Sequence, residues 1–166
     1  EKQAKSYYQK ALELNPNYVP AFMSLKQLLE KQKSQLTNDS IRMLKLEDEI
    51  FQLSLNASKQ SGYDNVPDVW VSLANHYIKK KQFNKEISAF KHILPFLEKS
   101  IVESIEKVRI TEDQGVKKMI RNQIRQMGGK FQAICSEVEK RLRVLGDKEE
   151  ANKYHSLAVK YNAYLK

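Results

Sequence analysis

The sequence predicts an all-α protein, and three observations support that fold class. Apolar residues recur at i, i+3, i+4 and i+7 through most of the chain, which is the spacing of one face of an α-helix. Proline and glycine, which disturb helix interiors, number only four and five among 166 residues. No β-branched stretch alternates strictly with polar residues, so no strand is expected. The apolar ladders and their breaks predict about nine helices.

Residues 1–18 are expected to form the second helix of a hairpin whose first helix lies upstream. Ala4, Tyr8 and Ala11 fall on one stripe, where small side chains let neighbouring helices approach closely. Pro16 lacks an N–H group and ends the helix. The stretch AKSYYQKALELNP is similar to the second helix and exit turn of the tetratricopeptide repeat, a helical hairpin of about 34 residues. We therefore expect the chain to be a fragment of a larger protein of this repeat family.

Residues 19–59 are expected to form a degenerate repeat. Phe22, Leu25 and Leu29 fill the aromatic, leucine and tyrosine positions of the family's first helix, called helix A. Lys26 departs from the pattern, because it stands where the family has glycine or alanine. The second helix, called helix B, is predicted to be longer than in the family.

This extended helix B is predicted from about Asp39 to Lys59. The polar residues Thr37-Asn38-Asp39-Ser40 offer several side chains for an N-cap. Glu47-Asp48-Glu49 interrupts the apolar ladder and is interpreted as solvated. The ladder itself comprises Ile41, Leu44, Ile50, Phe51, Leu53 and Leu55. The loop QSGYDNVP follows, and the next helix is expected to begin at its final proline or one residue later.

Residues 67–94 match the repeat pattern over most of its length. The aromatic, leucine and small positions of the pattern are filled, in order, by Trp70, Leu73-Ala74, Tyr77, Phe83 and Phe90. Lys81 stands where the turn glycine is usual, and Glu86 stands where helix B has a small alanine. We therefore expect the two helices of this hairpin to stand slightly further apart than in the family.

Residues 95–166 are expected to form divergent C-terminal helices and a terminal cap. Pro95 is predicted to begin one helix, because proline is favoured at the first helical position. Gly128-Gly129 is predicted to separate the next two helices. Gly146-Asp147 precedes the last helix, which is predicted over residues 148–165.

The resemblance implies one helical domain, 1–166, in which antiparallel hairpins stack into a tetratricopeptide-like α-superhelix, or solenoid. It also implies a non-catalytic scaffold that binds a peptide or a partner subunit of a multiprotein complex in its groove. In the family, the inner face of each helix A lines that groove. The inner-face residues are expected to be Met23, Gln27, Glu30, Val71, Asn75, Ile78 and Lys79. The family's clamp for chaperone tails is incomplete, because Val71 replaces the lysine expected four residues before Asn75.

A formal net charge of +9 points to an acidic partner. The charge gathers in a basic patch that comprises Lys117, Lys118, Arg121, Arg125, Lys130, Lys140, Arg141 and Arg143. Within the patch, Lys117, Arg121 and Arg125 share one helical ridge at i, i+4 and i+8. The patch has three interpretations: a solvated outer face, a surface for an acidic protein segment, or a nucleic-acid-binding module. Nucleic acid is the less favoured partner, because the ridge lacks interleaved aromatic residues.

The sequence carries no catalytic signature, so an enzyme, a cofactor and a metal site are not expected. The histidines His76, His92 and His155 lack a second metal ligand at i+3 or i+4. Cys135, the single cysteine, lies in an apolar ladder and is expected to be buried. Low cysteine usage favours a reducing compartment, and no apolar run reaches the roughly 20 residues of a membrane span. An intracellular protein of the cytoplasm or nucleus is therefore expected, with its oligomeric state left open.

Overall fold

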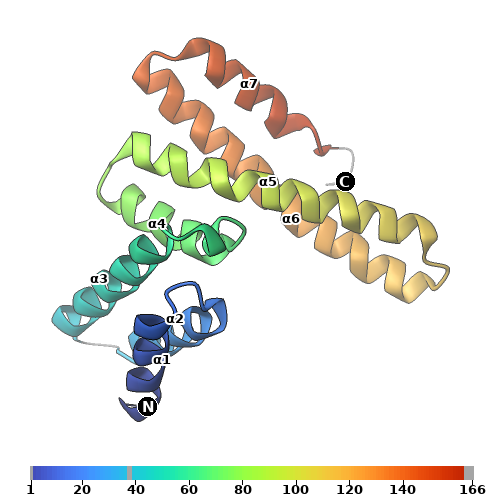
Figure 1. Cartoon of the computed structure of the whole chain (residues 1–166). Coiled ribbons are helices and arrows are strands. Elements are labelled where there is room, and N and C mark those ends of the chain that lie inside the picture. Colours follow the sequence, from blue (N-terminus) through green and yellow to red (C-terminus); the bar gives the residue numbers. More distant parts are fainter. Residues whose placement is uncertain (1, 37–38, 163–166) are drawn as a thin grey trace. The chain divides into compact units, whose positions relative to one another are not determined.

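A computed structural model describes residues 2–36 and 39–162 of the chain (Figure 1). Within these ranges, every regular element is helical: seven α-helices and one 3₁₀ helix. The all-α prediction is therefore confirmed for the described residues. The chain divides into two compact units, Glu1–Gln82 and Phe83–Lys166. In the described residues, no helix is both long enough and apolar enough to cross a lipid bilayer.

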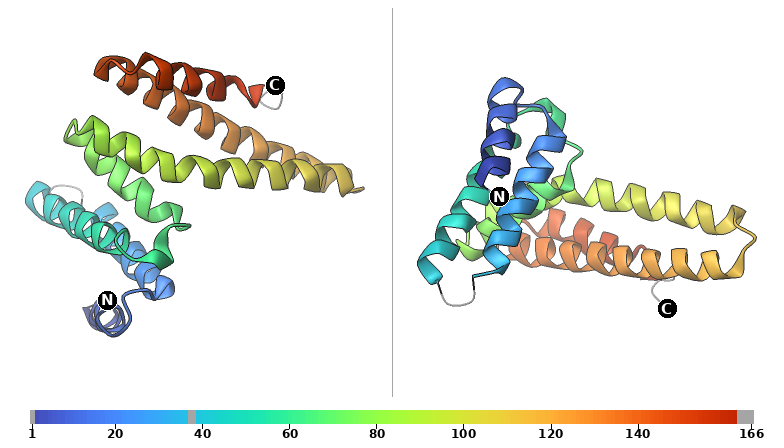
Figure 2. Two further views of the ribbon diagram at one scale, coloured as in Figure 1. Left: turned by 45° about the horizontal axis from the view of Figure 1, so that its top comes forward. Right: turned by 90° about the horizontal axis from the view of Figure 1, so that it is seen from below.

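The first unit is built from four α-helices and a short 3₁₀ helix. These are α1 (Lys2–Leu14), α2 (Val19–Ser34), α3 (Ser40–Ala57), η1 (Ser61–Tyr63) and α4 (Pro67–Lys79). Each α-helix packs on the next along the chain (Figure 2). Leu25, Leu29 and Ile50 form a buried cluster between α2 and α3, and Tyr8 of α1 packs against it. The apolar ladders read from the sequence therefore supply this core.

Two helix starts in the first unit agree with the sequence prediction. Asp39 is the N-cap of α3, and its side chain accepts a hydrogen bond from the backbone N–H of Arg42 at 2.9 Å. Helix α4 begins at Pro67, whose missing N–H group would have no partner inside the helix in any case. Helix α3 ends at Ala57, within two residues of the predicted Lys59.

Helix α4 ends in a Schellman motif. The N–H of Gln82 donates to the carbonyl of Tyr77 at 3.0 Å, and the N–H of Lys81 donates to that of Ile78 at 3.1 Å. Lys81 has a φ of 53°, in the left-handed region that favours glycine. The residue that replaces the usual turn glycine therefore adopts the backbone conformation for which the repeat uses glycine.

The second unit consists of α5 (Phe83–Ile110), α6 (Gln114–Leu145) and α7 (Lys148–Val159). Helix α6 packs on both α5 and α7. The buried cluster of this unit comprises Leu94, Ile101, Ile120, Ile124, Phe131, Cys135, Ala158 and Tyr161. Helices α5 and α6 continue as a two-helix extension beyond the end of α7 (Figures 1 and 2).

Pro95 does not begin a helix, and that prediction is wrong. Helix α5 runs without interruption through Pro95. A proline inside a helix costs about 3 kcal/mol, because it lacks an N–H group and crowds the carbonyl of residue i−4. Leu94 and Ile101, on either side of it, are buried in the cluster of the second unit. Burial of such side chains stabilises by roughly 2 kcal/mol each, which offsets the local cost.

The predicted break at Gly128-Gly129 is also wrong, because α6 runs through both glycines. A glycine in a helix interior costs only about 1 kcal/mol relative to alanine. Ile124 and Phe131 hold the flanking turns in the buried cluster. These two continuous helices explain why the described residues form seven α-helices instead of about nine.

The last helix begins at Lys148 as predicted but ends at Val159. The predicted continuation to Leu165 lies partly outside the described residues. Asp147 caps α7 by accepting a hydrogen bond from the N–H of Glu150 at 3.0 Å, and Asp113 caps α6 in the same way through Val116 at 2.8 Å. The hairpin over residues 67–94, the spacing of its helices and the stacking into a superhelix remain predictions.

Candidate functional site

A small surface pocket in the first unit brings together side chains from α2, α3 and α4. Its volume is about 100 Å³. Glu30, Asn75 and Lys79, three of the predicted inner-face residues, line it. The rest of its wall comprises Lys33, Glu47, Ile50, Phe51, Ser72 and His76. The structure thus brings residues from two of the predicted inner faces to one pocket.

Glu47 organises the charges of this pocket. Its Oε1 atom lies 2.8 Å from Nζ of Lys79 and 3.4 Å from Nζ of Lys33. The hydrogen bond from Lys79 is the main reason why the pKa of Glu47 lies below its ordinary value, and burial opposes it. A carboxylate of a partner would therefore compete with Glu47 for ion pairs with Lys79 and Lys33.

His76 and Phe51 form a flat aromatic wall of the pocket. Their rings are stacked, with centroids 3.6 Å apart and planes inclined by 12°. Burial, reinforced by the charge of Lys80, holds the pKa of His76 below its ordinary value and so favours the neutral imidazole. The wall can therefore receive an apolar or aromatic side chain without burying a charge.

The other four predicted inner-face residues do not line this pocket. Met23, Val71 and Ile78 keep 37%, 41% and 38% of their surface exposed. Gln27 is also exposed. Partly exposed apolar side chains of this kind are available to a partner, but the structure does not gather them around Glu30 and Asn75.

Lys26, the departure from the helix A pattern, is buried between α2 and α4. Only 6% of its surface is exposed. Its Nζ lies 2.7 Å from Oε1 of Glu30 and 3.3 Å from Oδ1 of Asp68. The paired carboxylates compensate the buried charge, since an unpaired ammonium in this position would be strongly destabilising. Lys26 therefore fixes Glu30 at the edge of the pocket.

Arg141, predicted as part of the basic patch, is engaged inside the second unit. Its Nε lies 3.2 Å from Oε1 of Glu86, whose side chain is fully buried. Its Nη2 lies 2.6 Å from Oε1 of Glu137, and the guanidinium lies 4.5 Å from the ring centre of Phe83. Arg141 thus compensates the charge of a glutamate that occupies a small-residue position of the repeat pattern.

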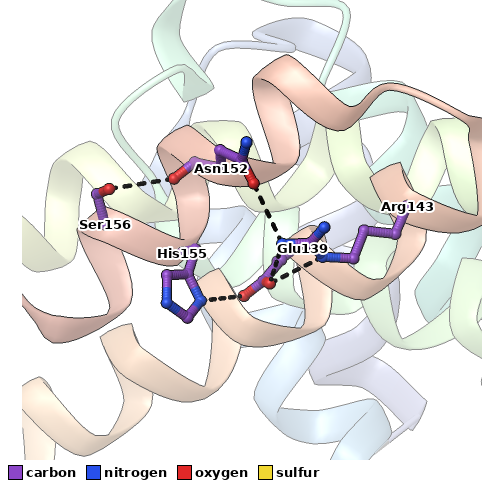
Figure 3. Close-up of polar contacts among 5 residues, drawn as sticks. All are labelled: Glu139, Arg143, Asn152, His155 and Ser156. Carbon is purple, nitrogen blue, oxygen red and sulfur yellow. Dashed lines mark hydrogen bonds and ion pairs between the residues drawn. The ribbon is translucent and has the colours of Figure 1, made fainter.

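Arg143 is also held by its own unit (Figure 3). Its Nη2 lies 2.9 Å from Oε1 of Glu139 and donates to Oδ1 of Asn152 at 3.2 Å. Nδ1 of His155 lies 3.1 Å from the other oxygen of Glu139. Burial raises the pKa of Glu139, but the hydrogen bonds from Arg143 and His155 outweigh it and hold that pKa below its ordinary value. This network joins α6 to α7.

The remaining basic residues concentrate on the first half of α6. Lys140 lies 3.7 Å from Oε2 of Glu137, so it also has a local carboxylate. Within residues 2–36 and 39–162, Lys117, Lys118, Arg121 and Lys130 form no ion pair. The uncompensated part of the predicted patch is therefore shorter than the sequence alone indicates.

Helix α1 completes the picture of the first unit. Tyr8 and Leu12 pack on the buried cluster of α2 and α3, and Ala4 and Ala11 are half-buried.

The family model of the tetratricopeptide repeat matches residues 1–18. This match confirms the resemblance at the segment whose motif is the most specific in the sequence. No curated protein matches the chain. The repeat indicates a protein-interaction module.

The sequence did not identify several residues of the pocket. The sequence predicts a solvated Glu47 and places Phe51 in an apolar ladder. Their place in the pocket depends on how α3 packs on α4, which periodicity alone does not reveal. Among the described residues, no group of three His, Cys, Asp or Glu side chains could hold a metal ion.

Proposed function

We propose that the chain is a non-catalytic scaffold that binds a peptide or a partner subunit within a multiprotein complex. The observation that carries the proposal is the convergence of Glu30, Asn75 and Lys79 in one pocket. These residues come from two different helices, as expected of the inner faces of neighbouring repeats. The tetratricopeptide match at residues 1–18 supports the same class of function, and that family is typically non-enzymatic.

The chemistry of the pocket fits an extended peptide with one apolar and one acidic side chain. The amide of Asn75 can both donate to and accept from a peptide group. The stacked rings of His76 and Phe51 offer an apolar wall. Lys79 and Lys33 supply positive charge for a carboxylate, at the expense of their contacts with Glu47. An intracellular location, in the cytoplasm or the nucleus, belongs to the same proposal.

The nucleic-acid alternative gains no support from the family match. Arg141, Arg143 and Lys140 are engaged by carboxylates of their own unit. An aromatic platform for bases would also be needed, and Phe131 is buried in the core. The protein-binding function is therefore the one that we propose.

A pull-down from cell lysate tests the inner-face proposal. The bait is the full chain, compared with the triple variant Val71→Ala, Asn75→Ala and Lys79→Ala. We expect the variant to lose specific partners while its circular dichroism spectrum stays helical. A control triple variant at exposed lysines of the same unit, Lys10→Ala, Lys45→Ala and Lys59→Ala, removes more charge and is still expected to keep them. If the inner-face variant retains the same partners, the proposal is wrong.

A further inference from the structure

One strip of α6 packs against α7 in the second unit. Cys135, Glu139 and Arg143 follow one another along it at i, i+4 and i+8. Cys135 lies in the buried cluster with Ala158 of α7. Glu139 contacts His155 of α7, and Arg143 contacts its Asn152 (Figure 3). This strip is therefore a helix-docking surface that α7 already occupies.

The predicted basic ridge is the continuation of the same strip. Lys117, Arg121 and Arg125 each lie eighteen residues before Cys135, Glu139 and Arg143, respectively. Eighteen residues make five turns of an α-helix at 3.6 residues per turn, so the two sets share one face of α6. α6 is continuous between them. The ridge thus lies in the N-terminal half of α6, on the face that α7 covers in the C-terminal half.

Side chains near both ends of α7 also pair with α5, and α7 ends at Val159. Near its start, Nζ of Lys91 lies 2.6 Å from Oε1 of Glu150. Near its end, Lys160 pairs with Glu98, and the Tyr161 hydroxyl donates to the same carboxylate at 3.1 Å. Helix α5 continues from Glu98 to Ile110, and the α5–α6 pair extends beyond the end of α7 (Figure 1).

The α5 side of the surface beside the ridge is apolar. Val102 and Ile105 follow Glu98 by four and seven residues, so they share the face that α5 presents to α7. Val102 keeps 53% of its surface exposed, and Ile105 is half-buried. The opposite side is strongly basic, because the sequence from Gln114 to Ser136 contains no Asp or Glu. An apolar edge therefore faces a ridge of positive charge.

We propose that this α5–α6 extension docks an acidic amphipathic helix of a partner protein, placed where α7 would continue. Its apolar side packs on Val102 and Ile105, and carboxylates spaced at i, i+4 and i+8 pair with Lys117, Arg121 and Arg125. The ridge spans roughly 12 Å at 1.5 Å per residue, so it pairs with about two helical turns of the partner. This surface is separate from the pocket of the first unit, so either proposal can fail alone.

Fluorescence anisotropy with a designed peptide tests the assignment. The probe is a fluorescein-labelled helix of about 18 residues, long enough to be helical in water, with leucine on one face and three glutamates beside it. We expect the full chain to bind it with a Kd of about 1–100 μM, weakening as salt rises. The Lys117→Glu, Arg121→Glu and Arg125→Glu triple variant is expected to weaken binding at least about tenfold.

Matched variants distinguish peptide binding at this surface from non-specific electrostatic binding of the acidic peptide to a basic protein. Lys99→Glu, Lys107→Glu and Lys153→Glu change the net charge equally at exposed positions of the same unit and are expected to alter binding less than about twofold. Val102→Asp is expected to weaken binding at least about fivefold, whereas Val102→Ile leaves it unchanged. Circular dichroism checks that each variant stays helical.

Three kinds of result would overturn the proposal. The first is a Kd above about 1 mM for the acidic peptide, or equal binding by the ridge variant and the matched variant. The second is tighter binding of a labelled single-stranded RNA that the ridge variant loses, which would assign the ridge to nucleic acid. The third is a dimer in light scattering that the ridge variant dissociates, which would assign this surface to a second copy of this chain.

Discussion

Three charged side chains, Lys26, Lys81 and Glu86, stand where the repeat pattern has small residues. Lys26 is compensated by Glu30 and Asp68, and Glu86 is compensated by Arg141. The sequence identified each departure but not the distant compensating residues, because Asp68 lies 42 residues from Lys26 and Arg141 lies 55 residues from Glu86. Such pairs depend on how helices pack, and local spacing does not encode them.

Lys81 keeps the left-handed backbone conformation of the glycine that it replaces, with a φ of 53°. A left-handed conformation costs a residue with a Cβ roughly 1 kcal/mol relative to glycine. We expect Lys81→Gly to raise the free energy of unfolding by about 0.5–1 kcal/mol, measured by urea denaturation. The neighbouring Lys80 has a φ of −90°, so Lys80→Gly serves as the control and should destabilise or be neutral. A loss of stability in Lys81→Gly would contradict the assigned turn geometry.

Arg141 gives a second prediction at the residue scale. Arg141→Met removes the cation beside the fully buried carboxylate of Glu86, and a buried charge without its partner destabilises by about 3 kcal/mol. We expect that loss in urea denaturation at pH 7. The double variant Glu86→Leu and Arg141→Met should lose less than the sum of the two single variants. Additive losses would show that the two side chains do not interact.

At the scale of elements, the helix starts were predicted well and two internal breaks were not. Asp39, Asp113 and Asp147 cap helices at places that the sequence marks with polar turn residues. Pro95 and Gly128-Gly129 are also residues that typically end helices, yet both lie inside continuous helices. The difference is tertiary, because long helices gain buried apolar area on both sides of the interruption.

Gly129 lies inside α6, where no close neighbour requires a glycine. A Cβ placed on Gly129 meets no atom of the described residues within 4 Å. We therefore expect Gly129→Ala to raise the free energy of unfolding by about 1 kcal/mol, because alanine favours the helix over the unfolded chain. Gly146, with a φ of 86°, is the matched control, and Gly146→Ala should destabilise by about 1 kcal/mol. Thermal unfolding followed by circular dichroism measures both changes.

The sequence predicts three of the nine residues that line the candidate pocket, and their role in binding a partner stays a prediction. The repeat register placed Glu30, Asn75 and Lys79 on inner faces, and the structure brings these three to one pocket. Glu47, Phe51 and His76 complete the pocket only because α3 packs against α4. Glu47 interrupts an apolar ladder and Phe51 belongs to it. This sequence pattern is the same whether or not the two side chains line a pocket.

At the scale of the whole molecule, each compact unit carries one natural probe of its own unfolding. Trp70, the single tryptophan, is buried in the first unit, and Cys135, the single cysteine, is buried in the second. Burial raises the pKa of the Cys135 thiol to about 12, so the reactive thiolate is scarce in the folded state. Alkylation of Cys135 therefore requires the second unit to open.

The two probes test whether residues 1–166 form one domain, as the sequence predicts. Stacked repeats share their stability through nearest-neighbour interfaces, so a single solenoid domain loses Trp70 burial and Cys135 protection together. We expect the urea midpoint of tryptophan fluorescence to coincide with the midpoint of iodoacetamide labelling in short pulses. Leu25→Ala, which opens a cavity in the cluster of the first unit, should then lower both midpoints. Separate midpoints, with only the fluorescence transition shifted by Leu25→Ala, would show two domains that fold independently.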